Sequence, residues 1–224
     1  KLMKRHFIIL IFLMTSHFAK SQDCNCQKDF EFVVNYYEEN LPGFIDNVTD
    51  YNIEDYKKFK NTLLNLSKNY CNDEDLCFKT LLVYVEFFKD NHSSIYTNNS
   101  VIVDEGRKKE VKQFLNSDLF INREIIENID SNTTNPIQEV ENKYQTKDAA
   151  YTVAIVKNKN NFRDYVGVII DSKTPLWKKG QVKFELKKVK ENTYDMFMYM
   201  RNHSLRYSKN VKLINGILND NWYN

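Results

Sequence analysis

The chain has 224 residues, of which 28% are charged and 42% hydrophobic, with 5 glycines and 3 prolines. This composition is typical of a globular protein and excludes a low-complexity or largely disordered chain. The 32 basic and 30 acidic side chains leave a net charge of +2, which offers no general attraction to phosphate backbones, so we expect no nucleic-acid partner. The length suits one or two domains.

The first 22 residues have the layout of a secretory signal peptide. Lys4 and Arg5 precede the apolar run 7–14, and a more polar stretch with small residues ends at Ser21. The run is too short to span a membrane, so we expect no stable membrane span once the signal is removed. The mature chain is expected to begin near Asp23 and to be exported, to the periplasm or the extracellular space. A lipid anchor on Cys24 is disfavoured because the residues before it are not small and apolar.

Four cysteines form an even set in a chain that is expected to be exported, which favours disulfides over metal ligands. Three pairings are formally possible. Cys71 and Cys77 flank the turn 72–75, so a bridge between them is the leading prediction, and Cys24 and Cys26 lie too close together for an easy bridge. The spacing is not a usual zinc pattern, and we expect neither a metal nor a cofactor.

The first part of the mature chain, residues 23–100, is predicted to be a helical domain. Four apolar residues share one face of a helix that Pro42 and Gly43 interrupt, namely Phe30, Val33, Val34 and Tyr37. The same spacing predicts a second helix over 55–70. Residues 76–88 are apolar almost all round, which is typical of a helix packed among others. This third helix is expected to end in a turn that displays His92.

Residues 101–136 are predicted to be a helical and linker segment. Helices are indicated at 108–115 and 123–129, and the polar run 130–136 is read as a linker. The domain boundary is placed there.

Beyond this segment the hydrophobic period becomes two. Val182, Phe184 and Leu186 alternate with lysine and glutamate, which predicts a strand with one buried and one wet face. Further strands are indicated at 151–156, 165–170, 194–200 and 211–214. Asn215 and Gly216 predict a type I′ hairpin turn. Residues 137–224 are therefore predicted to be a small antiparallel β domain, and the fold class is α+β: an N-terminal helical bundle followed by a small antiparallel β-sheet or barrel.

Two short motifs resemble those of a known enzyme family. Leu41-Pro42-Gly43-Phe44 resembles the "PGF" helix break, and Asp90-Asn91-His92-Ser93 resembles the "DGHT" turn, of S41 serine peptidases, the C-terminal-processing and tricorn-like family, in an exported Bacteroidetes-type branch. The segments 23–26 and 177–182 also look like that branch. The resemblance implies that the chain is the portion before the catalytic domain, truncated before the domain that carries the nucleophilic serine. The implied partner of the full-length parent is a peptide or protein substrate.

The resemblance makes His92 the candidate catalytic residue, as the general base that activates a serine in tricorn-like relatives. Neutral imidazole has a pKa suited to that task. The alternative is that His92 only caps a helix and hydrogen-bonds within a turn. A complete catalytic set could in principle draw on Ser93, Ser94, His203 and Ser204. No flanking glycines indicate an exposed nucleophile, so an intact serine-hydrolase site is not expected.

The run 196–200, rich in methionine, is compatible with a soft metal site or an adaptable peptide groove, but it is more typical of a buried strand. Two functions therefore remain open. The chain is read as the pre-catalytic region of an exported S41-type serine endopeptidase, inactive by itself because a base without a serine forms no acyl-enzyme. The alternative is a secreted binding module or pseudoenzyme whose β domain holds a peptide, lipid or glycan.

Overall fold

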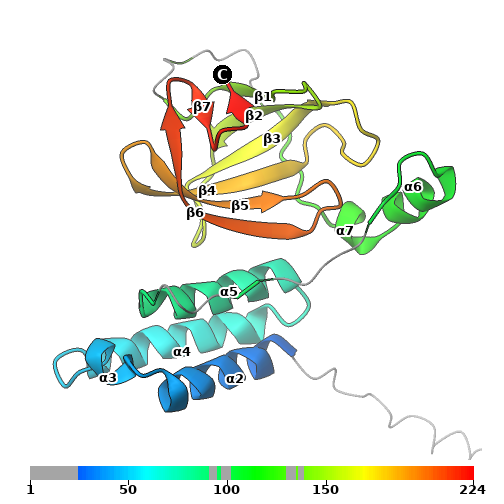
Figure 1. Cartoon of the computed structure of the whole chain (residues 1–224). Helices are drawn as coiled ribbons and strands as arrows, with labels where there is room; N and C mark the ends of the chain where they lie inside the picture. Colours follow the sequence, from blue (N-terminus) through cyan, green and yellow to red (C-terminus); the bar gives the residue numbers. More distant parts are fainter. Residues whose placement is uncertain (1–24, 91–94, 97–101, 130–134, 136–138) are drawn as a thin grey trace, which may run out of the picture. The chain divides into compact units, whose positions relative to one another are not determined.

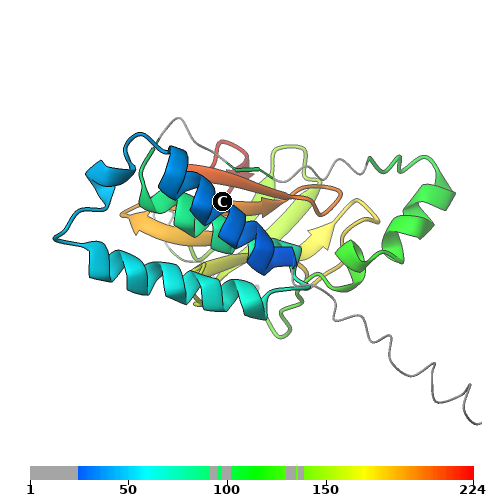
Figure 2. The same cartoon turned by 90° about the horizontal axis from the view of Figure 1, so that it is seen from below.

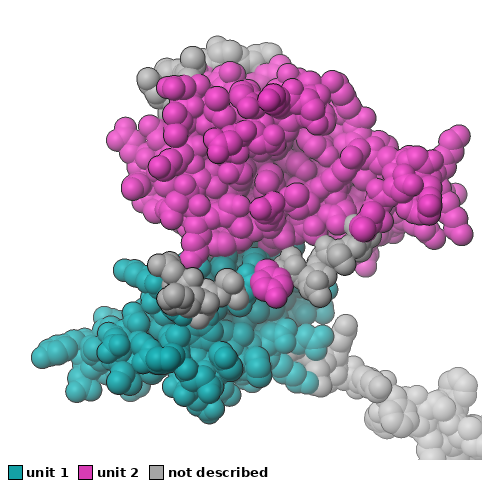
Figure 3. Space-filling model, viewed as in Figure 1, with its two compact units in different colours: residues 1–95 teal, residues 96–224 magenta. Residues whose placement is uncertain are grey.

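The computed structural model describes residues 25–90, 95–96, 102–129, 135 and 139–224. Two compact units divide the chain, Lys1–Ile95 and Tyr96–Asn224 (Figure 3). Each unit is described by itself below. Among the described helices, none combines the length and the apolar character needed to cross a bilayer.

The first unit consists of helices α2 (Asn25–Asn40), α3 (Phe44–Asn47), α4 (Ile53–Asn69) and α5 (Glu74–Phe87), and the three longer ones lie side by side (Figures 1 and 2). The break between α2 and α3 falls at the predicted Pro42 and Gly43. The Asp73 side chain caps α5 by accepting a hydrogen bond from the Leu76 amide at 2.9 Å. Aromatic side chains dominate the core, where the Tyr56 hydroxyl donates to Glu38 at 2.6 Å and lies 2.9 Å from the Tyr84 hydroxyl.

A disulfide joins α2 to α5. Cys26 and Cys77 are bonded with their Cα atoms 5.6 Å apart, and 51 positions separate them along the chain. The predicted Cys71–Cys77 bridge is therefore wrong, although Cys71 is also disulfide-bonded. Both bonded sulfurs belong to buried residues, 2% and 8% exposed. Helix packing, and not nearness in sequence, decides which cysteines meet.

In the described residues of the second unit there are two short helices, α6 (Lys108–Leu115) and α7 (Asp118–Ile121), and eight strands. Each strand pairs antiparallel with the next, and the last pairs with the first, so the sheet closes into a barrel (Figure 1). The strands are β1 (Lys143–Thr146), β2 (Tyr151–Lys157), β3 (Tyr165–Ser172), β4 (Val182–Lys190), β5 (Thr193–Tyr199), β6 (Leu205–Ile214), β7 (Ile217–Leu218) and β8 (Trp222–Tyr223).

The predicted fold class, a helical bundle followed by a small sheet or barrel domain, is wrong. In the described residues the central feature is a closed antiparallel barrel of eight strands, not a small sheet that follows a bundle, and the helices have 4 to 17 residues. Closure depends on β1 and β8, which have 4 and 2 residues, too short to display a period of two in the sequence. The helix predicted at 123–129 is also wrong, because Ile125 forms an antiparallel bridge with Gln181.

The hairpin predicted at Asn215 and Gly216 is confirmed. Their φ angles are 51° and 78°, and they join β6 to β7, whose residues Ile214 and Ile217 pair across the turn. A type I′ turn needs positive φ at both central positions, which asparagine and glycine adopt most readily. The pair Asn215 and Gly216 was sufficient to predict this turn, because the preference of these two residues for positive φ determines the turn type.

The wet face predicted for β4 is wrong. Lys183 and Glu185 are only 4% and 2% exposed, as buried as the apolar residues between which they alternate. Glu185 accepts a hydrogen bond from the Tyr199 hydroxyl at 2.8 Å and lies 3.6 Å from Arg163. Arg163 in turn pairs with Glu124 at 2.6 Å. Polar partners from other segments therefore make burial of this face possible.

Candidate functional site at one mouth of the barrel

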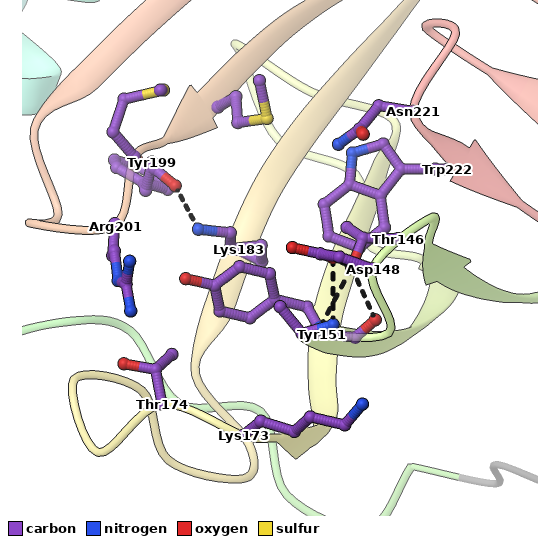
Figure 4. A pocket seen from close by; sticks show the side chains of 13 residues that line it. Thr146, Asp148, Tyr151, Lys173, Thr174, Lys183, Tyr199, Arg201, Asn221 and Trp222 are labelled. Atoms are coloured by element: carbon purple, nitrogen blue, oxygen red, sulfur yellow. Dashed lines mark hydrogen bonds between the residues drawn. The ribbon is translucent and has the colours of Figure 1, made fainter.

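In an antiparallel barrel with strands in sequence order, alternate connections meet at the same end. The β1–β2, β3–β4, β5–β6 and β7–β8 connections share one mouth, and residues from all four line a cavity of about 400 Å³ there (Figure 4). Barrel mouths are common places for ligand sites. The cavity is therefore the natural candidate site of the second unit.

Lys183 reaches this cavity from the start of β4. Val182 and Phe184 pair with the adjacent residues Val168 and Gly167 of β3, so β4 carries one extra residue, as at a β-bulge, and Lys183 lies within it. A bulge can re-aim a side chain relative to the regular alternation of a strand. The Lys183 Nζ donates a hydrogen bond to the Tyr199 carbonyl oxygen at 2.7 Å (Figure 4).

Two aromatic rings flank the same amine. Nζ lies 4.1 Å from the Trp177 ring centroid and 4.4 Å from that of Tyr151. Such contacts favour a protonated amine by about 2 kcal/mol when desolvated, whereas burial can disfavour it by up to about 4 to 7 kcal/mol. Burial, reinforced by the positive charges of Arg123 and Arg201, lowers the pKa of Lys183 well below its ordinary value. The amine is therefore held toward its neutral form.

The remaining walls combine apolar surface with one further donor. Tyr151, Met198, Met200 and Trp222 line the cavity. Trp222 is 1% exposed, and its indole Nε1 has no hydrogen-bond acceptor among the described residues. A buried donor of this kind is satisfied when a bound molecule supplies an acceptor.

A charged cluster borders the cavity. Arg201 contacts the Glu105 carboxylate at 2.5 Å, and the Thr174 hydroxyl donates to the same carboxylate oxygen at 2.5 Å. Burial raises the pKa of Glu105, but the hydrogen bonds from Arg201 and Thr174 outweigh it and hold that pKa below its ordinary value. Lys173, which is exposed, adds a second cation at the rim.

His203, in the β5–β6 connection, is fully buried beside this mouth. Its Nδ1 lies 3.0 Å from the Leu119 carbonyl oxygen and its Nε2 lies 2.8 Å from the Leu176 carbonyl oxygen. A neutral imidazole has one N–H and can donate to only one of them. The Ser204 hydroxyl donates to Asn202 at 2.7 Å instead of contacting the imidazole. These bonds give His203 a structural role, joining three segments.

Stability of the barrel is expected to fall as pH drops from about 6.5, the ordinary histidine value, to about 4. Burial lowers the pKa of His203 to about 4, and the positive charge of Arg123 acts in the same direction against the two carbonyl contacts. Within this window the unfolded chain binds a proton that the barrel does not, so stability is lost as pH falls. Urea denaturation at a series of pH values measures the loss. His203→Gln is expected to reduce this pH dependence, and equal slopes for both proteins would contradict the assignment.

Several residues predicted from the sequence lie outside the described residues. These are His92, Ser93 and Ser94, so the candidate general base has no structural account. In the described ranges, no cluster of three or more His, Cys, Asp or Glu side chains is arranged to hold a metal ion. Met198 and Met200 of the methionine-rich run do line the cavity, and Met196 is fully buried in β5.

Sequence reasoning missed Lys183. In the sequence it is one of several lysines alternating with apolar residues, which is the pattern of a solvated strand face. The neighbouring Trp177 and Gly180 mark a structured connection before β4, but no short-range signal indicates that this connection covers the lysine.

Comparison with known protein families, with curated proteins and with solved structures finds no match to this chain.

Proposed function

We propose that the second unit is a binding module whose barrel mouth holds a small ligand combining an apolar group with an oxygen acceptor. The observation that carries the proposal is the cavity of about 400 Å³ lined by residues from four connections. Sites for small molecules commonly have volumes of about 300 to 1,000 Å³ and pair apolar walls with a few polar groups. This mouth has both features.

The donors at the mouth indicate the chemistry of the ligand. Nε1 of Trp222 lacks an acceptor among the described residues, and the Lys183 amine offers a second buried N–H beyond the one used by Tyr199. Carbonyl and carboxylate oxygens would satisfy both donors. The rim carries both signs of charge, because Asp148 lines the cavity beside Lys173 and Arg201 is paired with Glu105, so the buried donors and not the net charge indicate the ligand.

The proposal can be tested with 8-anilinonaphthalene-1-sulfonate, which combines aromatic rings with an anionic oxygen group. The two tryptophans of the chain, Trp177 and Trp222, both lie at this mouth, so energy transfer from tryptophan reports dye bound near the barrel, and paired variants locate the site. Ala150→Phe, which adds a ring at the mouth, is expected to weaken dye binding about tenfold, or about 1.4 kcal/mol.

A matched control places the same ring at the opposite end of the barrel. Val189 is 51% exposed near the end of β4, away from the cavity, and Val189→Phe is expected to leave dye affinity unchanged. Loss of binding in both variants, or in neither, would contradict a site at the mouth. Displacement of the dye by fatty acids or by short peptides would then identify the ligand class.

We also propose that the module is exported and serves an S41-type serine peptidase as a non-catalytic part. Support comes from the Leu41-Pro42-Gly43-Phe44 motif, which falls at the break between α2 and α3, and from a disulfide-bonded first unit, which suits an oxidising compartment. In that setting the ligand would be a peptide segment. Displacement of the dye by peptides but not by fatty acids would favour this proposal.

A further inference from the structure

The Lys183 amine combines burial with access to a cavity. Its residue is 4% exposed, yet it lines the mouth of the barrel. Among the described residues, no carboxylate lies within 4.0 Å of Nζ, and its polar contact is the Tyr199 carbonyl oxygen at 2.7 Å. A buried lysine is ordinarily paired with an acidic group. This amine instead meets a carbonyl oxygen, two aromatic rings and the space of the cavity.

The surroundings also fix the position of the amine. Lys183 lies in the β-bulge of β4, between residues that pair with β3. Its Nζ is 4.1 Å from the ring centroid of Trp177 and 4.4 Å from that of Tyr151, which is drawn beside it in Figure 4. A reactive group on a packed strand is held more firmly than one on a loop. A desolvated lysine in an apolar pocket is a recurring way of making an amine nucleophilic.

We propose that Lys183 is a covalent attachment site for an aldehyde or ketone ligand, which it holds as an imine at the barrel mouth. The inference rests on the proposed function in that it uses the same cavity, and it deepens that function by naming a carbonyl compound as the ligand. The apolar walls formed by Met198, Met200 and Trp222 favour a carbonyl compound with a hydrocarbon or aromatic group.

The chemistry balances without a further reactant. The lone pair of neutral Nζ forms a bond to the carbonyl carbon while the C=O π electrons move to oxygen. Both hydrogens of the amine then leave with that oxygen, which gives one imine and one water molecule, with no change in oxidation state. Because burial lowers the pKa of Lys183, a larger fraction of this amine is neutral at a given pH than of an exposed lysine.

The test is reductive trapping with hexanal and sodium cyanoborohydride at pH 7, followed by peptide mass spectrometry. Lys183 is expected to gain a hexyl group at least about tenfold faster than Lys173, which lies at the same mouth but is exposed. Lys183→Met should abolish that labelling, whereas Lys173→Met should leave the rate at Lys183 unchanged. Equal rates at Lys183 and Lys173 in the folded protein would overturn the inference.

A second measurement does not depend on whether the Lys183→Met protein folds. In the unaltered chain, saturating 8-anilinonaphthalene-1-sulfonate should protect Lys183 from hexanal and leave Lys173 reactive. Dye binding without labelling of Lys183 would overturn the covalent inference and leave reversible binding standing. Labelling of Lys183 without any dye binding would support the reactive amine and contradict the wider proposal that the mouth binds a ligand combining an apolar group with an oxygen acceptor.

Discussion

Replacing both Cys26 and Cys77 by alanine is expected to lower the free energy of unfolding of the helical unit by up to about 4 kcal/mol. The bond joins α2 to α5 across 51 positions, and the chain-entropy estimate for a closed loop of that length gives this value as an upper limit, because the disulfide at Cys71 still constrains the unfolded chain. Because a small domain is stable by only about 5 to 15 kcal/mol, a loss of this size would unfold much of the unit under mild denaturing conditions. Urea denaturation followed by far-ultraviolet circular dichroism measures it.

The two tryptophans provide an internal control for this variant. Both belong to the barrel unit, so tryptophan fluorescence reports on the unfolding of the barrel while circular dichroism also detects the helices. The fluorescence transition is expected to stay unchanged in the Cys26→Ala/Cys77→Ala protein. An equal loss in both transitions would show that the disulfide supports more than the helical unit, and no loss in either would contradict the estimate.

Gly167→Ala is expected to destabilise the barrel by about 3 kcal/mol, the upper end for an overpacked core. A Cβ atom at this position would lie 2.3 to 2.6 Å from three ring atoms of Phe184. Phe184 is fully buried and contacts the Trp222 ring at a centroid distance of 5.1 Å, so it cannot swing into solvent. The midpoint of the tryptophan fluorescence transition in urea is the appropriate measurement.

Replacing the Phe184 ring by a leucine side chain distinguishes steric overlap at position 167 from a general effect of alanine in a strand. Gly167→Ala combined with Phe184→Leu should be less destabilised than the sum of the two single variants, because each change relieves the other. Gly106→Ala controls for the loss of a glycine without a ring contact, since Gly106 lies in an exposed turn and a Cβ there would meet only the Asp104 side chain, at 3.2 Å. Strict additivity of the pair would contradict the close approach of Gly167 to the ring.

The sequence was informative where a local pattern determines the conformation. The helix predicted at 108–115 coincides with α6, and the Asn215–Gly216 turn has the backbone angles that its residues favour. The strands predicted from Tyr151 and Tyr165 begin where β2 and β3 begin. In each case the signal lies within a few residues of the structure it predicts.

What could not be predicted depends on contacts between distant segments. Closure of the sheet requires β1 to meet β8, and the Cys26–Cys77 bond requires α2 to pack on α5. The burial of Lys183 depends on Trp177 and on the start of β2, which the alternation within β4 does not reveal. The hydrophobic periodicity of a sequence indicates which face of a strand is polar, but it does not indicate whether another segment covers that face.

The seam between β1 and β8 is one of the sparsely paired parts of the barrel wall. It is held by two residue pairs, Gln145 with Tyr223 and Thr146 with Trp222, as many as join β6 to β7 or β7 to β8, whereas β2 and β3 share seven. Thr146 and Trp222, on opposite sides of the seam, both line the cavity. A molecule bound at the mouth would therefore contact both sides of a sparsely paired seam, so that occupancy of the site and local opening of the barrel oppose each other.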